Sequence, residues 1–358
     1  MTLIERINAL ITSIGADIKA LANNKVDKTA TITIANGGTG ATTTTQARKN
    51  IGTIEYVASL PAIPEANKFY AVKNGDNVDL YMSDSAGTVF YKFTTSQQTI
   101  NRLSIGDIIS QLFINSEQGF AFDFNDLSTM YQDAAGTIPV TGVGQPVGKV
   151  LDKSGRGNHA TQSTSSKRPI LQQNASTGAY YLSFDGVDDC LVTGDIDFTG
   201  KNNMSLFSAA IFNNLSSASQ VIVELSTASW NTQGTFSLIR GYNNTTSYAL
   251  RRNFSTNGGF EDLVSQNDNN TKAVLTGIIN STANVEYMRN LGASIGNKTL
   301  TASSNTFKNY PLYIGIGEIT KYPLNGNLYS LIGIARLATD AEITNTEKTL
   351  AKNVGVTL

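Results

Sequence analysis

A glycine-rich stretch near the N-terminus, ANGGTGATTTTQARKNIG (35–52), is the first candidate for chemistry, because closely spaced glycines can cradle a phosphate. A phosphate loop also needs a lysine followed by serine or threonine after its last glycine, but here Gly40 is followed by Ala41 and Thr42. A dinucleotide-binding turn needs a third glycine where Thr43 stands. We therefore interpret these glycines as backbone elements of a turn before a short helix.

The single histidine, His159, and the single cysteine, Cys190, restrict the chemistry that side chains can supply. One cysteine excludes an intrachain disulfide, and the pair offers no thiol and imidazole cluster for zinc. A Ser/His/Asp triad would have to use His159, which lies in the glycine-flanked stretch SGRGNHA. We interpret His159 and the nearby Asp152 as turn residues.

Five aspartates in the stretches FDGVDD and GDIDF offer the hard oxygen ligands that calcium prefers. Asp-Gly pairs are typical of turns, however, and a calcium loop usually shows a denser alternation of ligands. We therefore expect no metal at these residues: Asp185, Asp188, Asp189, Asp195 and Asp197.

Aromatic, amide and guanidinium side chains concentrate in SWNTQGTFSLIRGYNNTTSYALRRNFSTNGGF (229–260). Aromatic faces stack on sugars, and amides and guanidinium groups bind hydroxyl and carboxyl groups. If TFSLIRGY and SYALRRNF pair as a hairpin, one exposed sugar-contacting patch can form from Trp230, Arg240, Tyr242, Tyr248 and Arg252. The alternative places Tyr242, Tyr248 and Phe254 in the core, which is the commoner fate of aromatic residues in strands.

The composition limits the classes of protein to which the chain can belong. With 358 residues and 40 % apolar content, it can form one large domain and smaller ones. Its 27 basic and 28 acidic residues form no run of like charge, which argues against a nucleic-acid groove. No apolar stretch approaches the ~20 residues of a membrane span. Charged residues such as Glu5, Arg6 and Asp17 interrupt any signal peptide, so we expect the chain to stay in the cytoplasm where it is made.

The first 25 residues carry the apolar spacing of a coiled coil, with intervals of 3, 4, 3, 4 and 3 residues between successive positions. Isoleucine at both seam positions favours three or four strands over two, and we expect a homotrimer. The seam consists of Ile4, Ile7, Ile11, Ile14, Ile18 and Leu21. The alternative is an amphipathic helix that lies on its own chain, since the seam covers under three heptads and Gly15 weakens it.

A small β module follows from Thr53, with strands expected near Lys68–Lys73, Val78–Ser83 and Thr88–Phe93. Three strands alone bury too little surface to be stable, so the module also favours assembly of several chains. The stretch RLSIGDIISQLF has apolar residues at helical spacing and is expected to join the module to the rest of the chain.

The remaining ~250 residues contain many short strand-like runs separated by turn residues, which predicts one β-sandwich. The one helix expected there is terminal. Thr339 and Glu342 form a capping box that opens DAEITNTEKTLAKN, and Gly355 lies beyond its end.

Two groups of motifs resemble known families. The stretch ANGGTGATTTTQARKNIG resembles a glycine/threonine element of bacteriophage tail fibres. The stretches VLDKSGRGNHATQ, YLSFDGVDD and LYSLIGIARLATDAEITNTEKTLAKNVGV resemble parts of laminin G-like, concanavalin A-type jelly rolls. The resemblance implies a mostly β chain with a coiled-coil attachment segment at 1–28, a tail-fibre joint at 29–52, a β-meander shaft module at 53–110 and a lectin head at 111–358.

What this fold does depends on its site. Retaining glycoside hydrolases of this fold carry a Glu-x-Asp-x-x-Glu strand motif, and no glutamate here has an aspartate two positions later. A carboxylate pair from distant strands stays open as an alternative. The resemblance implies a trimeric virion tail protein, without catalysis or cofactor, that attaches to a tail or baseplate protein through its N-terminus and binds a bacterial surface polysaccharide for host adsorption. The alternatives are a tail-borne glycan depolymerase and a purely structural tail protein.

Overall fold

The computed structural model describes residues 55–93, with gaps at 58, 64, 66–67, 75–76, 84–85, 87 and 89, and residues 103–358, with gaps at 214–217, 228–231, 256–258 and 318–319. The chain divides into two compact units, Met1–Thr99 and Ile100–Leu358. The predicted coiled coil and glycine/threonine joint lie outside the described residues.

The described part of the first unit is a four-stranded sheet in the order β1-β2-β3-β4. Strand β1 runs parallel to β2, and the other neighbours are antiparallel. The last three strands match the predicted meander, whereas β1 is an addition. The strands are β1 (Glu55–Val57), β2 (Phe69–Asn74), β3 (Asn77–Ser83) and β4 (Phe90–Phe93).

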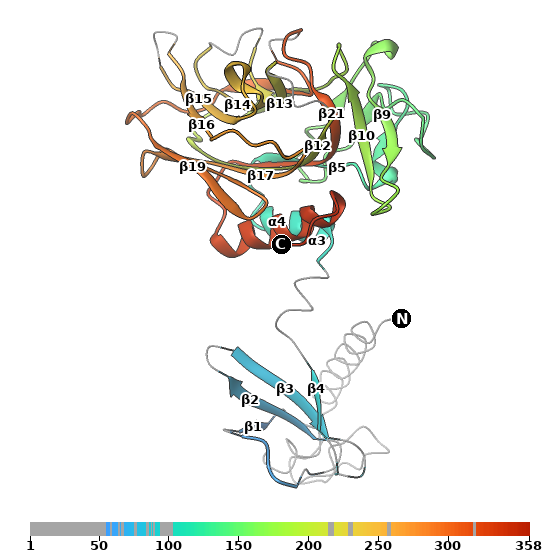
Figure 1. The fold of residues 1–358 in the computed structure, drawn as a ribbon, viewed down its shortest axis with the longest axis vertical. Helices are drawn as coiled ribbons and strands as arrows, with labels where there is room; N and C mark the ends of the chain where they lie inside the picture. The colour runs from blue at the N-terminus through green and yellow to red at the C-terminus, as the bar shows by residue number, and fades with distance from the viewer. Residues whose placement is uncertain are drawn as a thin grey trace, which may run out of the picture. The chain divides into compact units, whose positions relative to one another are not determined.

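The second unit is a sandwich of two sheets (Figure 1), which confirms the predicted β-sandwich. The eight-stranded sheet has the order β19-β18-β17-β12-β21-β10-β9, and β5 also pairs with β21. Its strands are β5 (Gly119–Asp123), β9 (Ile170–Gln173), β10 (Tyr180–Asp185), β12 (Asn203–Phe212), β17 (Lys272–Asn280), β18 (Val285–Asn290), β19 (Ala293–Thr299) and β21 (Asn325–Ile334).

The nine-stranded sheet has the order β16-β15-β14-β13-β20-β11-β8-β7-β6, so β16 is an edge strand. Its strands are β6 (Met130–Tyr131), β7 (Lys149–Val150), β8 (Ala160–Thr161), β11 (Leu191–Asp197), β13 (Gln220–Leu225), β14 (Thr235–Arg240), β15 (Tyr248–Asn253), β16 (Glu261–Val264) and β20 (Asn309–Ile314). Short 3-10 turns lie at η3 (Leu127–Thr129), η4 (Ser165–Lys167) and η5 (Tyr242–Asn244).

Two helices, α3 (Ile105–Leu112) and α4 (Asp340–Asn353), lie together against the eight-stranded sheet (Figure 1). The structure confirms the predicted capping box of α4, in which the hydroxyl of Thr339 accepts from the backbone of Glu342. Helix α3 has the predicted helical spacing, and its apolar face packs in the sandwich unit. The sandwich unit therefore begins before α3, upstream of the expected boundary at 110. No helix in the described ranges is long and apolar enough to cross a membrane.

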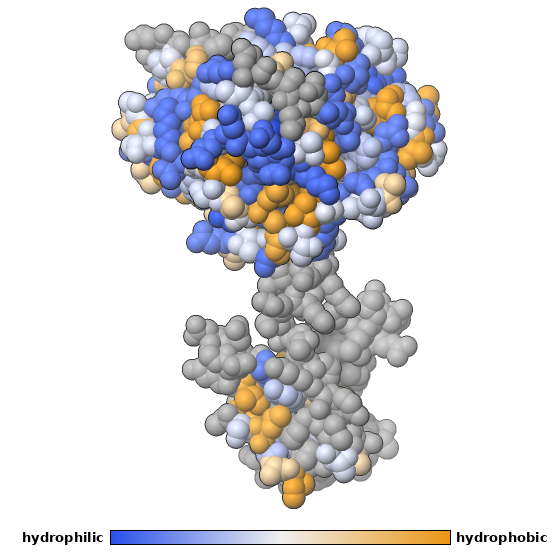
Figure 2. Space-filling view, in the orientation of Figure 1, coloured by the Kyte–Doolittle hydropathy of each residue, from blue (hydrophilic) through white to orange (hydrophobic). Residues whose placement is uncertain are grey.

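The main core fills the space between the two sheets, because alternate residues of each strand point inward. Phe122 of β5, Leu206 of β12 and Leu250 of β15 are all fully buried there. The visible face of the sandwich unit is mostly hydrophilic, with hydrophobic residues in small separate groups (Figure 2).

Candidate functional site

The predicted sugar-contacting hairpin forms, but most of its predicted contact residues are buried. Strands β14 and β15 pair as the hairpin expected from the sequence, and the register places Arg240 opposite Tyr248. Arg240, Tyr248 and Arg252 are each at most 1 % exposed, so the expectation that they line an open patch is wrong. The alternative that Tyr248 and Phe254 belong to the core is confirmed. Trp230 lies outside the described residues.

Arg240 is held inside the sandwich by backbone carbonyls. Its guanidinium donates to the carbonyl oxygens of Thr246 and Asp268 and lies 4.5 Å from the centre of the Tyr248 ring. After Arg240, Gly241 adopts a left-handed conformation with φ of 74°, which ends the alternation of the strand. Arg240 and Tyr242 therefore lie on different faces and cannot belong to one patch, and Tyr242 packs on the outer side with Ile239 and Ala249.

The outer face of the nine-stranded sheet carries a polar row that crosses five neighbouring strands. Each member of the row is the direct partner of the next. Leu238 and Leu250, which neighbour members of the row along their strands, point into the core. Because successive side chains of a strand point to opposite faces, the row points out of the sandwich. A bulge in β13 sends both Ile222 and Val223 inward and turns Glu224 outward. In strand order the row is Tyr313, Glu224, Ser237, Arg251 and Asp262.

Arg251, Asp262 and Tyr242 form a fixed polar network at one end of this row. Arg251 donates two hydrogen bonds to the Asp262 carboxylate, from Nε at 2.6 Å and from Nη2 at 3.0 Å. The Tyr242 hydroxyl also donates to Asp262. The Cζ atom of Arg251 lies 4.1 Å from the centre of the Phe260 ring. The network therefore presents aromatic faces beside a guanidinium with a single orientation.

Protonation in this network is set by the Arg251–Asp262 contact. Burial lowers the pKa of Arg251, but the hydrogen bonds and charge of Asp262 outweigh it and raise that pKa. Burial and the Asp262 carboxylate both raise the pKa of Tyr242, so its phenol stays protonated at neutral pH. The phenol therefore remains a hydrogen-bond donor, and the guanidinium stays charged.

This network opens into a cavity of about 180 Å³, which we call the outer cavity. Tyr322, 40 % exposed, and Phe260, 37 % exposed, contribute to its walls. The outer cavity is lined by Ser219, Val221, Glu224, Ile239, Tyr242, Asn243, Arg251, Phe260 and Tyr322. Of the predicted contact residues that the structure describes, Tyr242 is the one that lines this cavity, and the sequence prediction did not include Arg251, Phe260 or Tyr322. The alternation of β15 could have indicated Arg251, because it is out of phase with the core residue Leu250.

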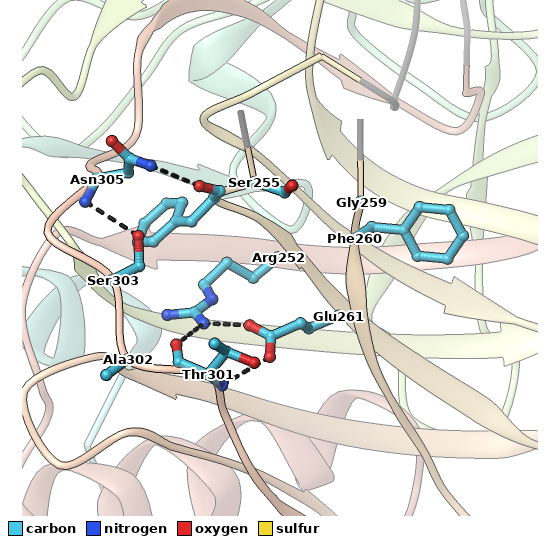
Figure 3. A pocket seen from close by; sticks show the side chains of 10 residues that line it. Arg252, Ser255, Gly259, Phe260, Glu261, Thr301, Ala302, Ser303 and Asn305 are labelled. Carbon is cyan, nitrogen blue, oxygen red and sulfur yellow. Dashed lines mark hydrogen bonds and ion pairs between the residues drawn. The ribbon is translucent and has the colours of Figure 1, made fainter. Parts of the chain in front are cut away.

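A second cavity, of about 400 Å³, surrounds Arg252 and is called the rim cavity here (Figure 3). It is lined by Arg252, Phe254, Ser255, Gly259, Phe260, Glu261, Thr301, Ala302, Ser303 and Asn305. Arg252 donates to the carboxylate of Glu261, to the Thr301 carbonyl at 3.0 Å and to the Ser281 hydroxyl at 2.9 Å. Burial raises the pKa of Glu261, but the Thr301 backbone and Arg252 outweigh it and lower that pKa.

One hydrogen-bond donor of Arg252 has no partner among the described residues. The Nε atom of Arg252 is buried and has no hydrogen-bond partner among the described residues. Buried donors are rarely left unpaired, so this N–H can donate to an acceptor supplied by a ligand or by water. Phe260 lines both the rim cavity and the outer cavity, and therefore joins them at the edge strand of the sheet.

A buried carboxyl group lies in the same end of the sandwich. Glu286 of β18 is 0 % exposed, and neither of its carboxyl oxygens has a partner among the described residues. Burial raises the pKa of Glu286 to about 8, although the charge of Arg252 acts in the opposite direction. Glu286 is therefore largely protonated at neutral pH and adds little charge to the region.

The polar row does not supply a carboxylate pair for glycoside hydrolysis. Glu224 and Asp262 are three strands apart, or roughly 14 Å at about 4.8 Å per strand. Hydrolases hold their two carboxyl groups about 5 to 9.5 Å apart. Asp262 is also committed to Arg251 and Tyr242, and Glu224 accepts from the Ser226 hydroxyl at 2.6 Å.

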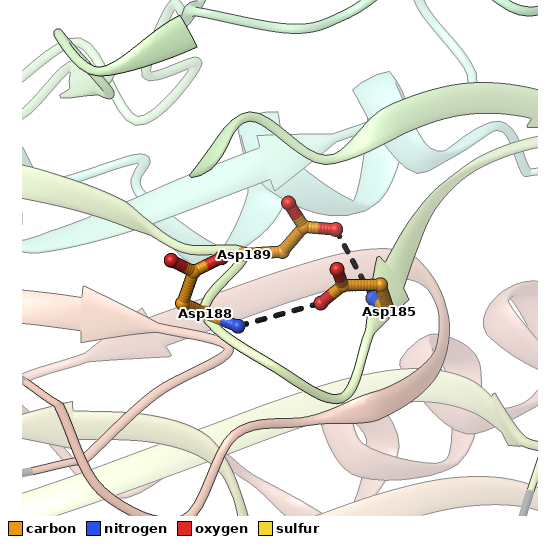
Figure 4. A group of neighbouring side chains, drawn as sticks. All are labelled: Asp185, Asp188 and Asp189. Carbon is orange, nitrogen blue, oxygen red and sulfur yellow. Dashed lines mark hydrogen bonds between the residues drawn. The ribbon is translucent and has the colours of Figure 1, made fainter. Parts of the chain in front are cut away.

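In the FDGVDD loop, aspartate carboxylates accept hydrogen bonds from backbone amides of the same loop (Figure 4). Asp189 accepts from the Asp185 amide at 3.0 Å, and Asp185 accepts from the Val187 amide at 2.8 Å. The ligand atoms of Asp185, Asp188 and Asp189 lie within 4.8 Å of one another. Burial, followed by the charge of Asp185, raises the pKa of Asp189 to about 6. These contacts agree with the predicted turn.

Asp152 and His159 also have structural roles. The buried Asp152 carboxylate accepts from the backbone amides of Ala121, Ser154 and Asn158 at 2.8–2.9 Å. The Asp152 amide donates to Nδ1 of His159 at 3.0 Å. Asp152 and His159 therefore hold the backbone of this turn, in agreement with their prediction as turn residues.

No family model matches the sequence, and no curated protein matches it. Solved structures do match. One is a GH54 α-L-arabinofuranosidase soaked with a cyclic sulfate inhibitor, with 11 % identity over 70 % of this chain and 66 % of that chain and a TM-score of 0.51. Another is the binding domain of botulinum neurotoxin DC in complex with SialylT, with 12 % identity over 66 % of this chain and 52 % of that chain and a TM-score of 0.45. The chain thus spans between half and two thirds of these proteins, and at such low identity the likeness to the arabinofuranosidase shows a shared β-sandwich fold alone.

Proposed function

We propose that this protein is a bacteriophage tail-fibre protein whose sandwich unit binds a bacterial surface glycan. The observation that carries glycan binding is the Tyr242–Arg251–Asp262–Phe260 network, of which Tyr242, Arg251 and Phe260 line the outer cavity. Sugars are recognised by aromatic faces combined with a few fixed polar groups, and this network supplies both. In this proposal the sandwich is a concanavalin A-like, laminin G-type jelly roll.

The network is already ordered before a ligand arrives, which lowers the entropic cost of binding. Arg251 is fixed by two hydrogen bonds to Asp262 and by its position over Phe260. Each stacking or charge-assisted contact contributes on the order of 1 kcal/mol, so one cavity binds weakly.

Trimerisation would convert this weak binding into firm attachment. We propose that three chains associate through the seam from Ile4 to Leu21 and carry three sites at fixed spacing. The tail-fibre resemblance of residues 35–52 supports attachment of the N-terminal part to a tail or baseplate protein, with the protein located in the virion tail.

The test uses the full-length protein on an array of bacterial capsular and lipopolysaccharide glycans, with release of reducing ends measured in parallel. Binding without cleavage is expected. Release of reducing ends would instead favour a depolymerase with a carboxylate pair outside the polar row. A folded protein that binds none of the glycans would contradict the proposal and favour a purely structural role.

A further inference from the structure

We propose that the rim cavity is a second sugar subsite that takes a neutral, hydroxyl-bearing sugar unit, so that the ligand is an oligosaccharide passing over Phe260. This inference rests on the proposed glycan binding at the outer cavity. It further specifies that the ligand has at least two sugar units and that the unit in the rim cavity is uncharged.

The walls of the rim cavity have the chemistry of a sugar site. Phe254 supplies aromatic surface, Phe260 borders the cavity, and Ser255, Ser303 and Asn305 supply hydroxyl and amide groups. Its volume of about 400 Å³ lies within the ~300–1,000 Å³ of small-molecule sites. A single sugar ring therefore has room in it.

Arg252 gives the cavity a specific donor. The side chain is 0 % exposed and held by Glu261, Thr301 and Ser281, yet Nε has no partner among the described residues. A buried, oriented donor without a partner favours a ligand that brings an acceptor. A sugar hydroxyl is such an acceptor.

The charge balance selects a neutral unit over an acidic one. Glu261 directly contacts Arg252 and compensates its charge. Glu261 also lines the cavity, so a carboxylate on the ligand would face a like charge. A hydroxyl group meets no such repulsion.

The position of Phe260 links the two cavities. Arg251 lies in the outer cavity and Arg252 in the rim cavity, and Phe260 contributes to both. In Figure 3 the Phe260 ring points away from Arg252 and Glu261. A ligand that fills both cavities must therefore cross the edge strand and contain at least two sugar units.

The experiment compares full-length wild type with Ala302→Phe. Ala302 is an exposed residue of the rim-cavity wall, so a phenyl group there obstructs the cavity without entering the core. Ala341→Phe is the matched control, because Ala341 is exposed on α4, which packs on the eight-stranded sheet. The probes are the monosaccharide, disaccharide and trisaccharide fragments of the array glycan that binds wild type most tightly, together with carboxyl-reduced forms of any acidic fragment.

Wild type and Ala341→Phe are expected to bind the trisaccharide about tenfold more tightly than the monosaccharide, because the second subsite adds stacking and polar contacts. Ala302→Phe is expected to lose this gain while it keeps monosaccharide binding. Carboxyl reduction of the unit in the rim cavity should not weaken binding. If the gain with length is missing in wild type, or survives in Ala302→Phe, the second subsite is contradicted while glycan binding stands. If wild type binds no glycan on the array, both proposals are contradicted.

Discussion

Arg251 and Arg252 are consecutive residues of β15, yet their guanidinium groups lie on opposite faces of the nine-stranded sheet. Arg251 bonds Asp262 on the outer face, whereas Arg252 bonds Glu261, Thr301 and Ser281 on the inner side. The pleat of the strand sets this division, because successive side chains point to opposite faces. One dipeptide therefore supplies a fixed guanidinium to each of two cavities.

The outer cavity gives the first prediction. Tyr242→Ala removes an aromatic face and the phenol that donates to Asp262, so glycan affinity per site should fall roughly tenfold. Titration of full-length protein with the best-binding glycan fragment measures this change. Tyr131→Ala, at the opposite edge of the same sheet, is the matched control and should bind as wild type does. Equal affinity of a folded Tyr242→Ala protein would remove Tyr242 from the site.

Glu286 gives a prediction about pH. Its pKa is about 8 in the folded protein and near the ordinary 4.5 when unfolded, so between these values the folded state holds a proton that the unfolded state has lost. The free energy of unfolding therefore falls as pH rises through this range, by up to about 1.4 kcal/mol per pH unit from this group. Glu286→Gln should match wild type near pH 5 and exceed its stability at pH 8 by on the order of 3 kcal/mol.

Urea unfolding of both proteins at several pH values checks this expectation. The charged groups that also influence the pKa of Glu286 are Arg252, Glu261, Lys298 and Asp262. A stability difference between Glu286→Gln and wild type that does not change with pH would contradict it.

Asp152 gives a prediction about stability. Asp152→Ala leaves the amides of Ala121, Ser154 and Asn158 without their acceptor inside the fold, which should cost about 3 kcal/mol or more. Asp197→Ala, at the exposed end of β11, is the control and should cost less, because Asp197 accepts from the Thr199 amide near the surface. Thermal or urea melts of both variants give the comparison, and similar losses would show that the Asp152 loop does not stabilise the sandwich.

Calcium gives a fourth prediction. Backbone amides already occupy oxygens of Asp185 and Asp189, so millimolar calcium should leave the melting temperature of the protein unchanged relative to EGTA. A rise in melting temperature that Asp188→Asn abolishes would instead identify the loop as a calcium site.

The assembly is tested by light scattering. Full-length protein at micromolar concentration should have the mass of three chains, and replacing Ile11 and Ile14 by aspartate should yield single chains because charges at seam positions oppose packing. A wild-type mass of one chain would contradict the trimer.

Local signals were sufficient for several elements of the fold. The capping box of Thr339 and Glu342 marks the start of α4 because its hydrogen bonds join residues three positions apart. The apolar spacing of α3 and the pairing of β14 with β15 could likewise be predicted, since both depend on neighbouring stretches of chain. The role of α3 could not, because it depends on a sheet whose strands come later in the sequence.

The sequence by itself therefore determined a mostly β chain with a sandwich, its terminal helix and the β14–β15 hairpin, because periodicity and turn chemistry act over short distances. Tertiary structure decided which polar residues face a cavity. Arg240 can be buried because the backbone carbonyls of Thr246 and Asp268 accept its hydrogen bonds. Arg252 can be buried because the Glu261 carboxylate compensates its charge and the Thr301 carbonyl accepts from it. The polar row from Tyr313 to Asp262 exists because five strands align in register. Neither charge compensation nor the register between distant strands can be predicted from single residues of the sequence.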